Sequence, residues 1–250
     1  MIKKSIEWNI TGADVLYEDE AIIVVNKPSG VPSQATLDPN RDHAYAAVSR
    51  YLHGGYVGLH HRLDAGTSGV LLMTKVQEAN ASVSEQFQKH TIKKTYTALS
   101  CGESPDGRIA SGANFLMKAA IGECEKTKVQ KFCVGGKKRK HAETQVQCEQ
   151  LIRLRDGYFG QFACQPLTGR THQIRVHLEA LGMGIVGDGL YGSGLLRSLR
   201  SIDPGRMCLH ASELEFEHPL TGEPMRVKAP LPGAMEKFVR KALLFEDRTH

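Results

Sequence analysis

Among the acidic residues, Asp64 has the surroundings that best suit chemistry. It follows Arg62 and precedes the polar loop of residues 65–69 (Ala-Gly-Thr-Ser-Gly), after which residues 70–73 form an apolar run. A carboxylate at the junction of a loop and a strand can be held rigidly, and it can act as a nucleophile or accept a proton. An aspartate before a glycine-containing loop more commonly starts a turn by accepting backbone N–H bonds. Spacing alone favours the turn, and catalysis by Asp64 is the alternative.

A second polar group surrounds an expected helix start at residues 167–178 (Leu-Thr-Gly-Arg-Thr-His-Gln-Ile-Arg-Val-His-Leu). Helical spacing places His172, Arg175 and Glu179 on one face. The apolar residues of the other face are Ile174, Leu178 and Leu181. One interpretation is a solvated face with an Arg175–Glu179 ion pair, which contributes little to stability. The other is that Arg175 points inward to orient a carboxylate or hold a phosphate, as guanidinium geometry favours.

Histidine and cysteine spacings do not predict a metal centre. Neither the adjacent His60 and His61 nor the pair His172 and His177, five apart on one helix, forms a ready ligand set. The cysteines likewise contain no zinc-type or thioredoxin-type pair. They are Cys101, Cys124, Cys133, Cys148, Cys164 and Cys208. Counting leaves disulfides open, but without a secretory signal we expect buried or free thiols in a reducing compartment.

Positive charge concentrates in the middle of the chain. Residues 137–141 read Lys-Lys-Arg-Lys-His. Other basic residues of this region are Lys126, Lys128, Lys131, Arg153 and Arg155. Such a run is usually a solvated face, but at a hairpin tip it would contact phosphates, the main source of non-specific nucleic-acid affinity. Tyr96, close behind two lysines, is either a packed strand residue or a face on which a base stacks.

Composition excludes several classes of protein. The chain has 250 residues, of which 41% are hydrophobic and 24% charged, so it is neither a disulfide-stapled scaffold nor disordered nor collagen-like. The net charge of +5 permits a polyanionic partner without requiring one. The apolar run of residues 21–25 is too short for a signal peptide or a membrane span. We expect a cytoplasmic protein without a membrane segment.

The elements that must position these residues alternate between strands and helices. We expect extended structure over residues 15–26, ended by the turn at residues 27–30, and strands at 70–73 and 94–100. Two strands at 130–134 and 143–148 predict a hairpin with the basic run at its tip. The expected helices cover residues 43–52, 76–89 and 235–245, together with one that Thr168 or Thr171 caps and Gly182 ends. We predict one mixed α+β domain rich in antiparallel strands.

Three segments, in order, resemble the RluA family of pseudouridine synthases. They are residues 61–72 (His-Arg-Leu-Asp-Ala-Gly-Thr-Ser-Gly-Val-Leu-Leu), 94–96 (Lys-Thr-Tyr) and 168–178. Supporting similarities lie at residues 26–30, 186–192, 209–211 and 216–219. The resemblance covers about residue 15 to the C-terminus, and several ordered motifs of this length are specific. It departs from the family at Met183 and Gly184, where His-Pro is frequent.

The resemblance implies the pseudouridine synthase fold, an α+β catalytic domain with a long, mostly antiparallel sheet, flanking helices and a central active-site cleft. We expect it to occupy residues 1–250 as a single domain, with a basic hairpin insertion near 130–148. Because the first motif begins by residue 26, we expect no N-terminal S4 RNA-binding domain.

The resemblance also assigns roles. Asp64 is implied to be the catalytic aspartate, Tyr96 the aromatic that packs on the target base, and Arg175 the ion-pair partner of Asp64. Arg62 is implied to help displace the base from its stack. The other residues expected to bind substrate are His61, Thr67, Arg170, His172, Gln173, Lys137, Lys138, Arg139 and Lys140.

The implied activity is isomerisation of uridine to pseudouridine in structured RNA, a stem-loop of rRNA or tRNA, by a monomer without cofactor or metal. No electrons or groups enter the reaction, so a carboxylate suffices. One alternative is a nucleoside or RNA glycosidase that uses Asp64 with a second carboxylate such as Glu179 or Asp188. Another alternative is a binding-only RNA module.

Overall fold

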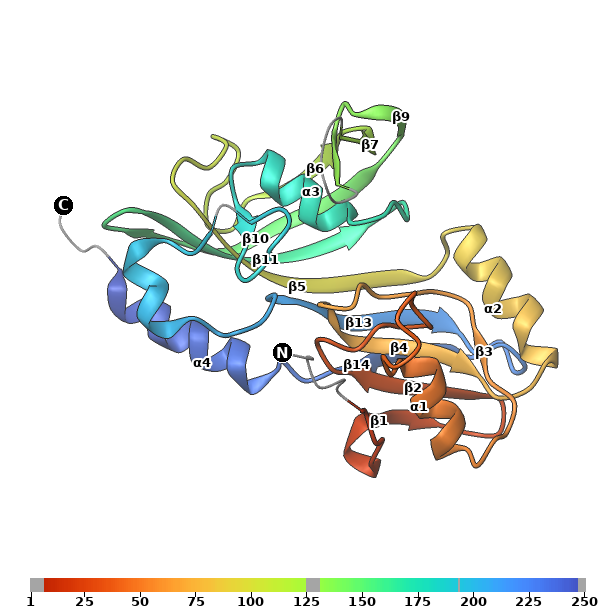
Figure 1. Cartoon of the computed structure of the whole chain (residues 1–250). Helices are drawn as coiled ribbons and strands as arrows, with labels where there is room; N and C mark the ends of the chain where they lie inside the picture. Colours follow the sequence, from red (N-terminus) through yellow and green to blue (C-terminus); the bar gives the residue numbers. More distant parts are fainter. Residues whose placement is uncertain (1–6, 125–130, 193, 247–250) are drawn as a thin grey trace. The chain divides into compact units, whose positions relative to one another are not determined.

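The computed structural model describes residues 7–124, 131–192 and 194–246 (Figure 1). The chain divides into two compact units. Unit 1 comprises Met1–Lys94 and Ala211–Pro230, and unit 2 comprises Thr95–His210 and Leu231–His250. Strands β5 (Lys93–Gly102) and β13 (Leu209–Glu217) contribute residues to both units.

Unit 1 is built on antiparallel strands. Its other elements are η1 (Gly12–Asp14), β1 (Val15–Glu18), β2 (Ile22–Lys27), α1 (Ala44–Tyr51), β3 (Gly58–Leu59), β4 (Ser68–Thr74), α2 (Glu78–Gln88) and β14 (Pro224–Lys228). Strand β2 pairs with β1 and β4, β3 pairs with β4, and β14 pairs with β13, all antiparallel. All seven residues of β4 are buried, as the continuous apolar run predicts for a central strand.

The two helices of unit 1 follow their sequence patterns. In α2, Ala79 and Val83 are buried and Phe87 packs beside them, so the four-residue spacing marks the buried stripe. Helix α1 begins after His43, whose Nδ1 accepts a hydrogen bond from the backbone N–H of Ala46. Both helix predictions are confirmed.

Unit 2 contains two sheets. Its elements besides β5 are β6 (Asn114–Lys118), β7 (Ile121–Glu123), β8 (Phe132–Val134), β9 (Lys137–Lys140), β10 (Glu143–Leu154), β11 (Gly157–Pro166), α3 (Gln173–Ala180), β12 (Gly184–Ile185), η2 (Arg197–Ile202), α4 (Gly233–Ala242) and η3 (Leu243–Phe245). The larger sheet has the order β5, β11, β10, β6, and the smaller one the order β8, β7, β9. The hydrophobic core of unit 2 includes Leu99, Phe159, Phe162, Leu178 and Phe238, each at most 1% exposed.

The fold is therefore α+β with predominantly antiparallel pairing, as predicted. Gly184, one of the two positions that depart from the family pattern, begins β12, which pairs with β5. All six cysteines carry free thiols and four are buried, as expected.

The basic segment differs from the predicted hairpin. Residues 132–134 pair with β7, whereas β10 pairs with β6 and β11. The basic run is itself strand β9, which also pairs with β7. The prediction was wrong here because the partner strand, residues 121–123, has too little periodicity to be recognised in the sequence.

Candidate active site

Asp64 lies in the loop between β3 and β4 of unit 1. The backbone N–H of Thr67 donates to the carbonyl oxygen of Asp64 over 3.0 Å, which closes a turn through Ala65 and Gly66. Thr67 is buried and Asp64 is half-buried. The turn and the catalytic interpretations of Asp64 are therefore compatible, because the main chain closes the turn.

A neighbouring segment, residues 27–33, holds this loop. The backbone N–H of Gly30 donates to the carbonyl of Ala65 over 2.7 Å, and the hydroxyl of Ser29 donates to the carbonyl of Gly66 over 2.7 Å. These bonds fix the backbone directly after Asp64. The sequence predicted a turn at residues 27–30 and a similarity to the family at residues 26–30, but it did not predict that this segment supports the Asp64 loop.

Two buried polar side chains complete the support. The ammonium of Lys27 is fully buried and donates to the carbonyls of Val31 (2.6 Å) and Ala65 (3.4 Å). The hydroxyl of Ser33 donates to the carbonyl of Leu63 and accepts from its N–H, both over 2.9 Å. A buried charge requires such partners, so Lys27 ties the loop to the segment. The result is a rigid frame on both sides of Asp64.

At Gly69, the last residue of the loop, two backbones approach closely. Its φ is +111°, and a Cβ there would lie 2.1 Å from the carbonyl oxygen of Ala211. Only glycine fits this close approach of two backbones at the start of β4.

His61 makes its described contacts within unit 1. Its Nε2 accepts a hydrogen bond from the backbone N–H of Leu72, and its ring stacks on Phe87 at 4.6 Å. Burial lowers the pKa of His61 to about 3, with smaller contributions from Lys94 and His60. The imidazole is therefore neutral and supports the strand. Arg62, next to it, is exposed.

Helix α3 starts differently from the expectation. Its N-cap is His172, in the left-handed conformation with φ 58°, rather than Thr168 or Thr171. The hydroxyl of Thr168 instead donates to Oε1 of Gln173 over 2.7 Å. The amide nitrogen of Gln173 donates to the Glu143 carbonyl over 2.8 Å. The buried Gln173 side chain thus joins the helix start to β10.

Arg175 is buried and forms a bidentate ion pair with Asp188. Nε lies 2.7 Å from Oδ2 and Nη2 lies 2.9 Å from Oδ1. Burial alone would raise the pKa of Asp188, but the Arg175 hydrogen bonds and charge lower it, together with the N–H groups of Leu190 and Tyr191. Of the two interpretations of Arg175, the inward-pointing one that holds a carboxylate is confirmed, and the solvated Arg175–Glu179 face is wrong, because Arg175 is buried while Glu179 is exposed.

This pair also bears on the glycosidase alternative. The side chain of Asp188 has no exposed surface, and both its oxygens accept hydrogen bonds from Arg175 or the backbone. A general acid or base must reach its substrate. Asp188 is therefore unsuited to be the second carboxylate, and Glu179 lies on the outer face of α3.

Tyr191 links Arg175 to the small sheet. The guanidinium carbon of Arg175 lies 4.8 Å from the centre of the Tyr191 ring. The Tyr191 hydroxyl accepts from the backbone N–H of Phe132 (3.0 Å) and lies 2.8 Å from Nδ1 of His172. Burial raises the pKa of Tyr191 to about 12, so the hydroxyl stays protonated.

Sequence reasoning named Asp188 only as a possible second carboxylate of a glycosidase, did not identify it as the partner of Arg175, and missed Tyr191. The only signal was their place in the similarity at residues 186–192, since a long-range ion pair leaves no local pattern.

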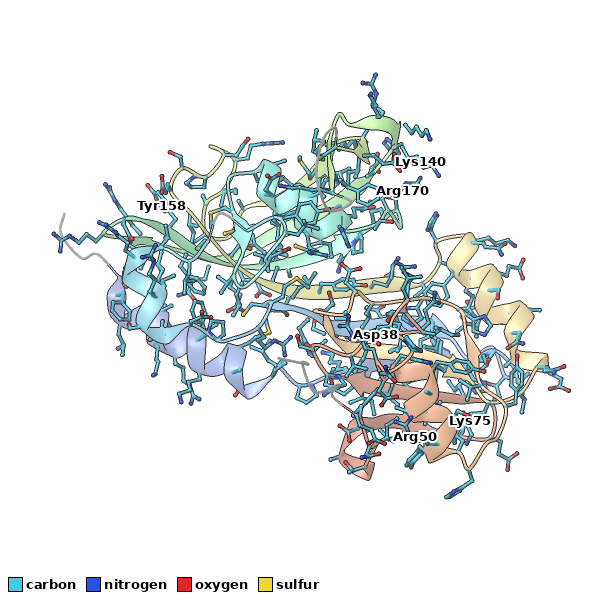
Figure 2. All side chains as sticks on the ribbon, viewed as in Figure 1. Asp38, Arg50, Lys75, Lys140, Tyr158 and Arg170 are labelled. Atoms are coloured by element: carbon cyan, nitrogen blue, oxygen red, sulfur yellow. The ribbon has the colours of Figure 1, made fainter. Side chains whose placement is uncertain are left out.

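The other expected substrate contacts also lie in unit 2. Tyr96 lies on β5 opposite Cys164 of β11 and is half-buried against the core. All four residues of β9, Lys137–Lys140, are exposed. Nε of Arg170 donates to the carbonyl of His141 over 2.7 Å, next to this strand. Figure 2 shows Lys140 and Arg170 in the same part of unit 2.

The described residues hold neither a cluster of metal ligands nor a helix that could span a membrane. No three histidine, cysteine or acidic side chains in residues 7–124, 131–192 and 194–246 cluster as a metal site requires. Among the same residues, no helix has the length and apolarity to cross a bilayer.

Comparisons with known sequences define the family. The family model described as RNA pseudouridylate synthase matches residues 21–180. The chain is 35% identical over 237 residues to ribosomal large subunit pseudouridine synthase C of Escherichia coli (strain K12), covering 91% of this chain and 69% of that protein. It is 33% identical over 226 residues to the Pasteurella multocida protein of the same name, covering 90% and 66%. The chain thus spans about two thirds of the length of these relatives.

Solved structures share the fold. Human RNA pseudouridylate synthase domain containing 1 matches with a TM-score of 0.68 at 26% identity, covering 97% of this chain and all of that one. Human RNA pseudouridylate synthase domain containing 4 matches with a TM-score of 0.69 at 22% identity, covering 91% and 92%.

Fold and sequence together define an RNA-modifying isomerase. The chain belongs to the RNA pseudouridylate synthase family.

Proposed function

We propose that the chain converts uridine to pseudouridine in structured ribosomal or transfer RNA, with Asp64 as the catalytic carboxylate, as a member of the RluA group. The observation that carries the proposal is the rigid frame around Asp64, in which buried Lys27 and the hydroxyls of Ser29 and Ser33 fix the flanking backbone. Curated relatives are named as synthases for ribosomal large subunit RNA and for tRNA.

The chemistry suits a carboxylate. The C1′–N1 bond breaks, the same uracil rejoins the sugar through C5, the C5 hydrogen leaves as a proton and N1 takes up a proton, so no oxidant or group donor is consumed. Asp64 attacks as a nucleophile or stabilises the cationic sugar. Since C5 is inaccessible within a helix, the nucleotide must be flipped out, with Tyr96 as a stacking face and Arg62 assisting displacement.

The substrate in this proposal is a stem-loop. The exposed basic strand β9 and Arg170 supply contacts to phosphates, which position RNA without reading its sequence. We expect a monomer that acts in the cytoplasm.

The reaction products test the proposal. RNA labelled with tritium at C5 of uridine is incubated with the chain, and released tritium and free uracil are both measured. Isomerisation must release tritium while the base stays in the RNA. Free uracil in solution would instead indicate a glycosidase, and neither product with retained RNA binding would indicate a binding-only module.

A further inference from the structure

The basic side chains of the described residues differ in whether carboxylates neutralise them. On unit 1, Arg226 lies 2.9 Å and Lys228 3.1 Å from Glu213, and Lys89 pairs with Glu85 at 2.5 Å. At one end of unit 2, by contrast, seven exposed basic side chains have no carboxylate within 4.0 Å among the described residues. They are Arg153, Arg155, Arg197, Arg200, Lys237, Arg240 and Lys241, and we call them the distal basic face.

These seven residues lie on three elements that are joined to one another. Asp156, in the turn between β10 and β11, accepts hydrogen bonds from the backbone N–H (3.2 Å) and the hydroxyl (2.5 Å) of Ser198 in η2. Phe159 of β11 packs on Phe238 of α4 with ring centres 5.6 Å apart. The distal basic face is therefore fixed on the turn of β10–β11, η2 and α4 rather than on independent loops.

Each element presents its cations along one side. Arg153 and Arg155 are two residues apart on a strand and its turn. Arg197 and Arg200 are one turn apart on a 3₁₀-helix. The three cations of α4 are Lys237, Arg240 and Lys241, at positions i, i+3 and i+4. Unpaired cations arranged in this way repel one another, and an anionic ligand would relieve that repulsion.

Strand β10 separates this face from the basic strand β9. β10 has twelve residues, and at about 3.3 Å per residue it spans about 40 Å. β9 ends three residues before β10 begins, while the distal basic face starts at its other end. Figure 2 shows Tyr158, the cross-strand neighbour of Arg153, at one end of the β10–β11 pair and Lys140 toward the other.

We infer that the distal basic face is a second RNA-binding surface, which holds the phosphates of a helix that extends from the modified stem-loop. The inference rests on the proposed function for its choice of RNA as the polyanion. Five of the seven cations are arginines, whose planar guanidinium suits bidentate contact with phosphate. At roughly 3 Å per base pair, contact with both surfaces requires about 13 base pairs.

The test removes three unpaired cations and compares two lengths of RNA. The variant carries Arg197→Gln, Arg200→Gln and Arg240→Gln, and the control carries Lys89→Gln, Arg226→Gln and Lys228→Gln. Both lose three positive charges, but the control loses only cations that carboxylates already neutralise. Fluorescein-labelled RNA duplexes of about 24 and about 8 base pairs serve as probes, and anisotropy gives Kd over a series of salt concentrations.

The long duplex should bind the variant about tenfold or more weakly at about 0.1 M salt, and the slope of log K against log salt should fall by about 2 to 3. The short duplex reaches one surface at a time, so its Kd should change by about twofold at most. The control should resemble the wild type, and equal melting temperatures would establish that all three proteins are folded.

The inference is overturned if the variant binds the long duplex as the wild type does, or if both lengths lose affinity equally. It is also overturned if polyglutamate of equal charge displaces the long duplex as well as unlabelled RNA does, which would indicate an acidic protein partner. Because the assay measures binding without turnover, length-dependent loss would stand even if no pseudouridine forms, and that second result would refute only the proposed function.

Discussion

At the scale of single residues, the side chain of Asp188 decides how Arg175 is held. Its two carboxylate oxygens accept hydrogen bonds from Nε and Nη2 of Arg175, over 2.7 and 2.9 Å. The side chain of Asp188 has no exposed surface. Its role is to position Arg175, since it faces no solvent. Arg175 can then present its remaining donors in one orientation only.

Replacing Asp188 by Asn keeps the shape of the side chain but removes the charge. Breaking a buried ion pair costs about 3 to 5 kcal/mol, so the free energy of unfolding in urea should fall by about that amount. If Arg175 acts in the reaction, single-turnover isomerisation should also slow by about tenfold or more, while RNA affinity changes little. Loss of affinity without loss of rate would contradict a positioning role.

Asp188→Asn should also remove part of the pH dependence of the free energy of unfolding. The pKa of Asp188 is lowered in the folded state, so its contribution is present above the unfolded value near 4 and disappears as pH falls below it. Urea unfolding of wild type and variant between about pH 3 and 7 should converge toward the acidic end. If the free energies of unfolding of wild type and variant differed by the same amount at every pH, a lowered pKa of Asp188 would be contradicted.

His61 should give a separate pH dependence. Its pKa falls from 6.5 in the unfolded chain to about 3 in the folded one. Below pH 6.5 the unfolded chain binds a proton that the folded chain does not, so stability falls with decreasing pH by up to about 1.4 kcal/mol per unit. His61→Gln keeps an acceptor for the Leu72 N–H and should flatten the curve between about pH 6 and 4. An unchanged slope of stability against pH would contradict a neutral His61 in the folded chain.

At the scale of elements, the loop before β4 depends on the close approach of two backbones. Gly69→Ala would place a methyl group 2.1 Å from the Ala211 carbonyl at a φ of +111°. Gly222 is the matched control, because its φ is +75° but nothing lies within 4 Å of its Cβ position. Gly222→Ala should cost about 1 kcal/mol and Gly69→Ala at least about 2 kcal/mol more. If the two variants lost the same free energy of unfolding in urea, the backbones at Gly69 and Ala211 would not be in close contact.

Tyr191 joins three elements, and removing its hydroxyl should loosen one of them. Tyr191→Phe keeps the ring under Arg175 but removes the hydroxyl that accepts from the Phe132 N–H and lies beside Nδ1 of His172. We expect a loss of about 1 to 3 kcal/mol and faster amide hydrogen exchange in β8. The control is Tyr51→Phe, because the Tyr51 hydroxyl donates to the exposed Glu18. Unchanged exchange in β8 would refute the link.

Local patterns predicted elements whose partners are close in sequence. The spacing of Ala79, Val83 and Phe87 sufficed for α2, and the apolar run after the glycine loop sufficed for β4. Local patterns did not predict structure that depends on a partner distant in the sequence. β9 is a strand because β7 pairs with it, and Arg175 is buried because Asp188 meets it from another loop.

At the scale of the whole molecule, the residues predicted to act together are divided between the two units. Asp64 belongs to unit 1, and Tyr96 and Arg175 belong to unit 2. The family resemblance named all three in advance, whereas the supports of Asp64 and Arg175 emerged only from the structure.

The most direct measurement is the pseudouridine content of RNA after incubation with the wild type or with Asp64→Asn, alongside the Kd of each protein for the same RNA. Asn preserves the size of the side chain and the backbone carbonyl that closes the turn with Thr67. We predict that pseudouridine formation falls by about 10³-fold or more while Kd stays within about threefold. Pseudouridine formed by Asp64→Asn at the wild-type rate would contradict the central claim.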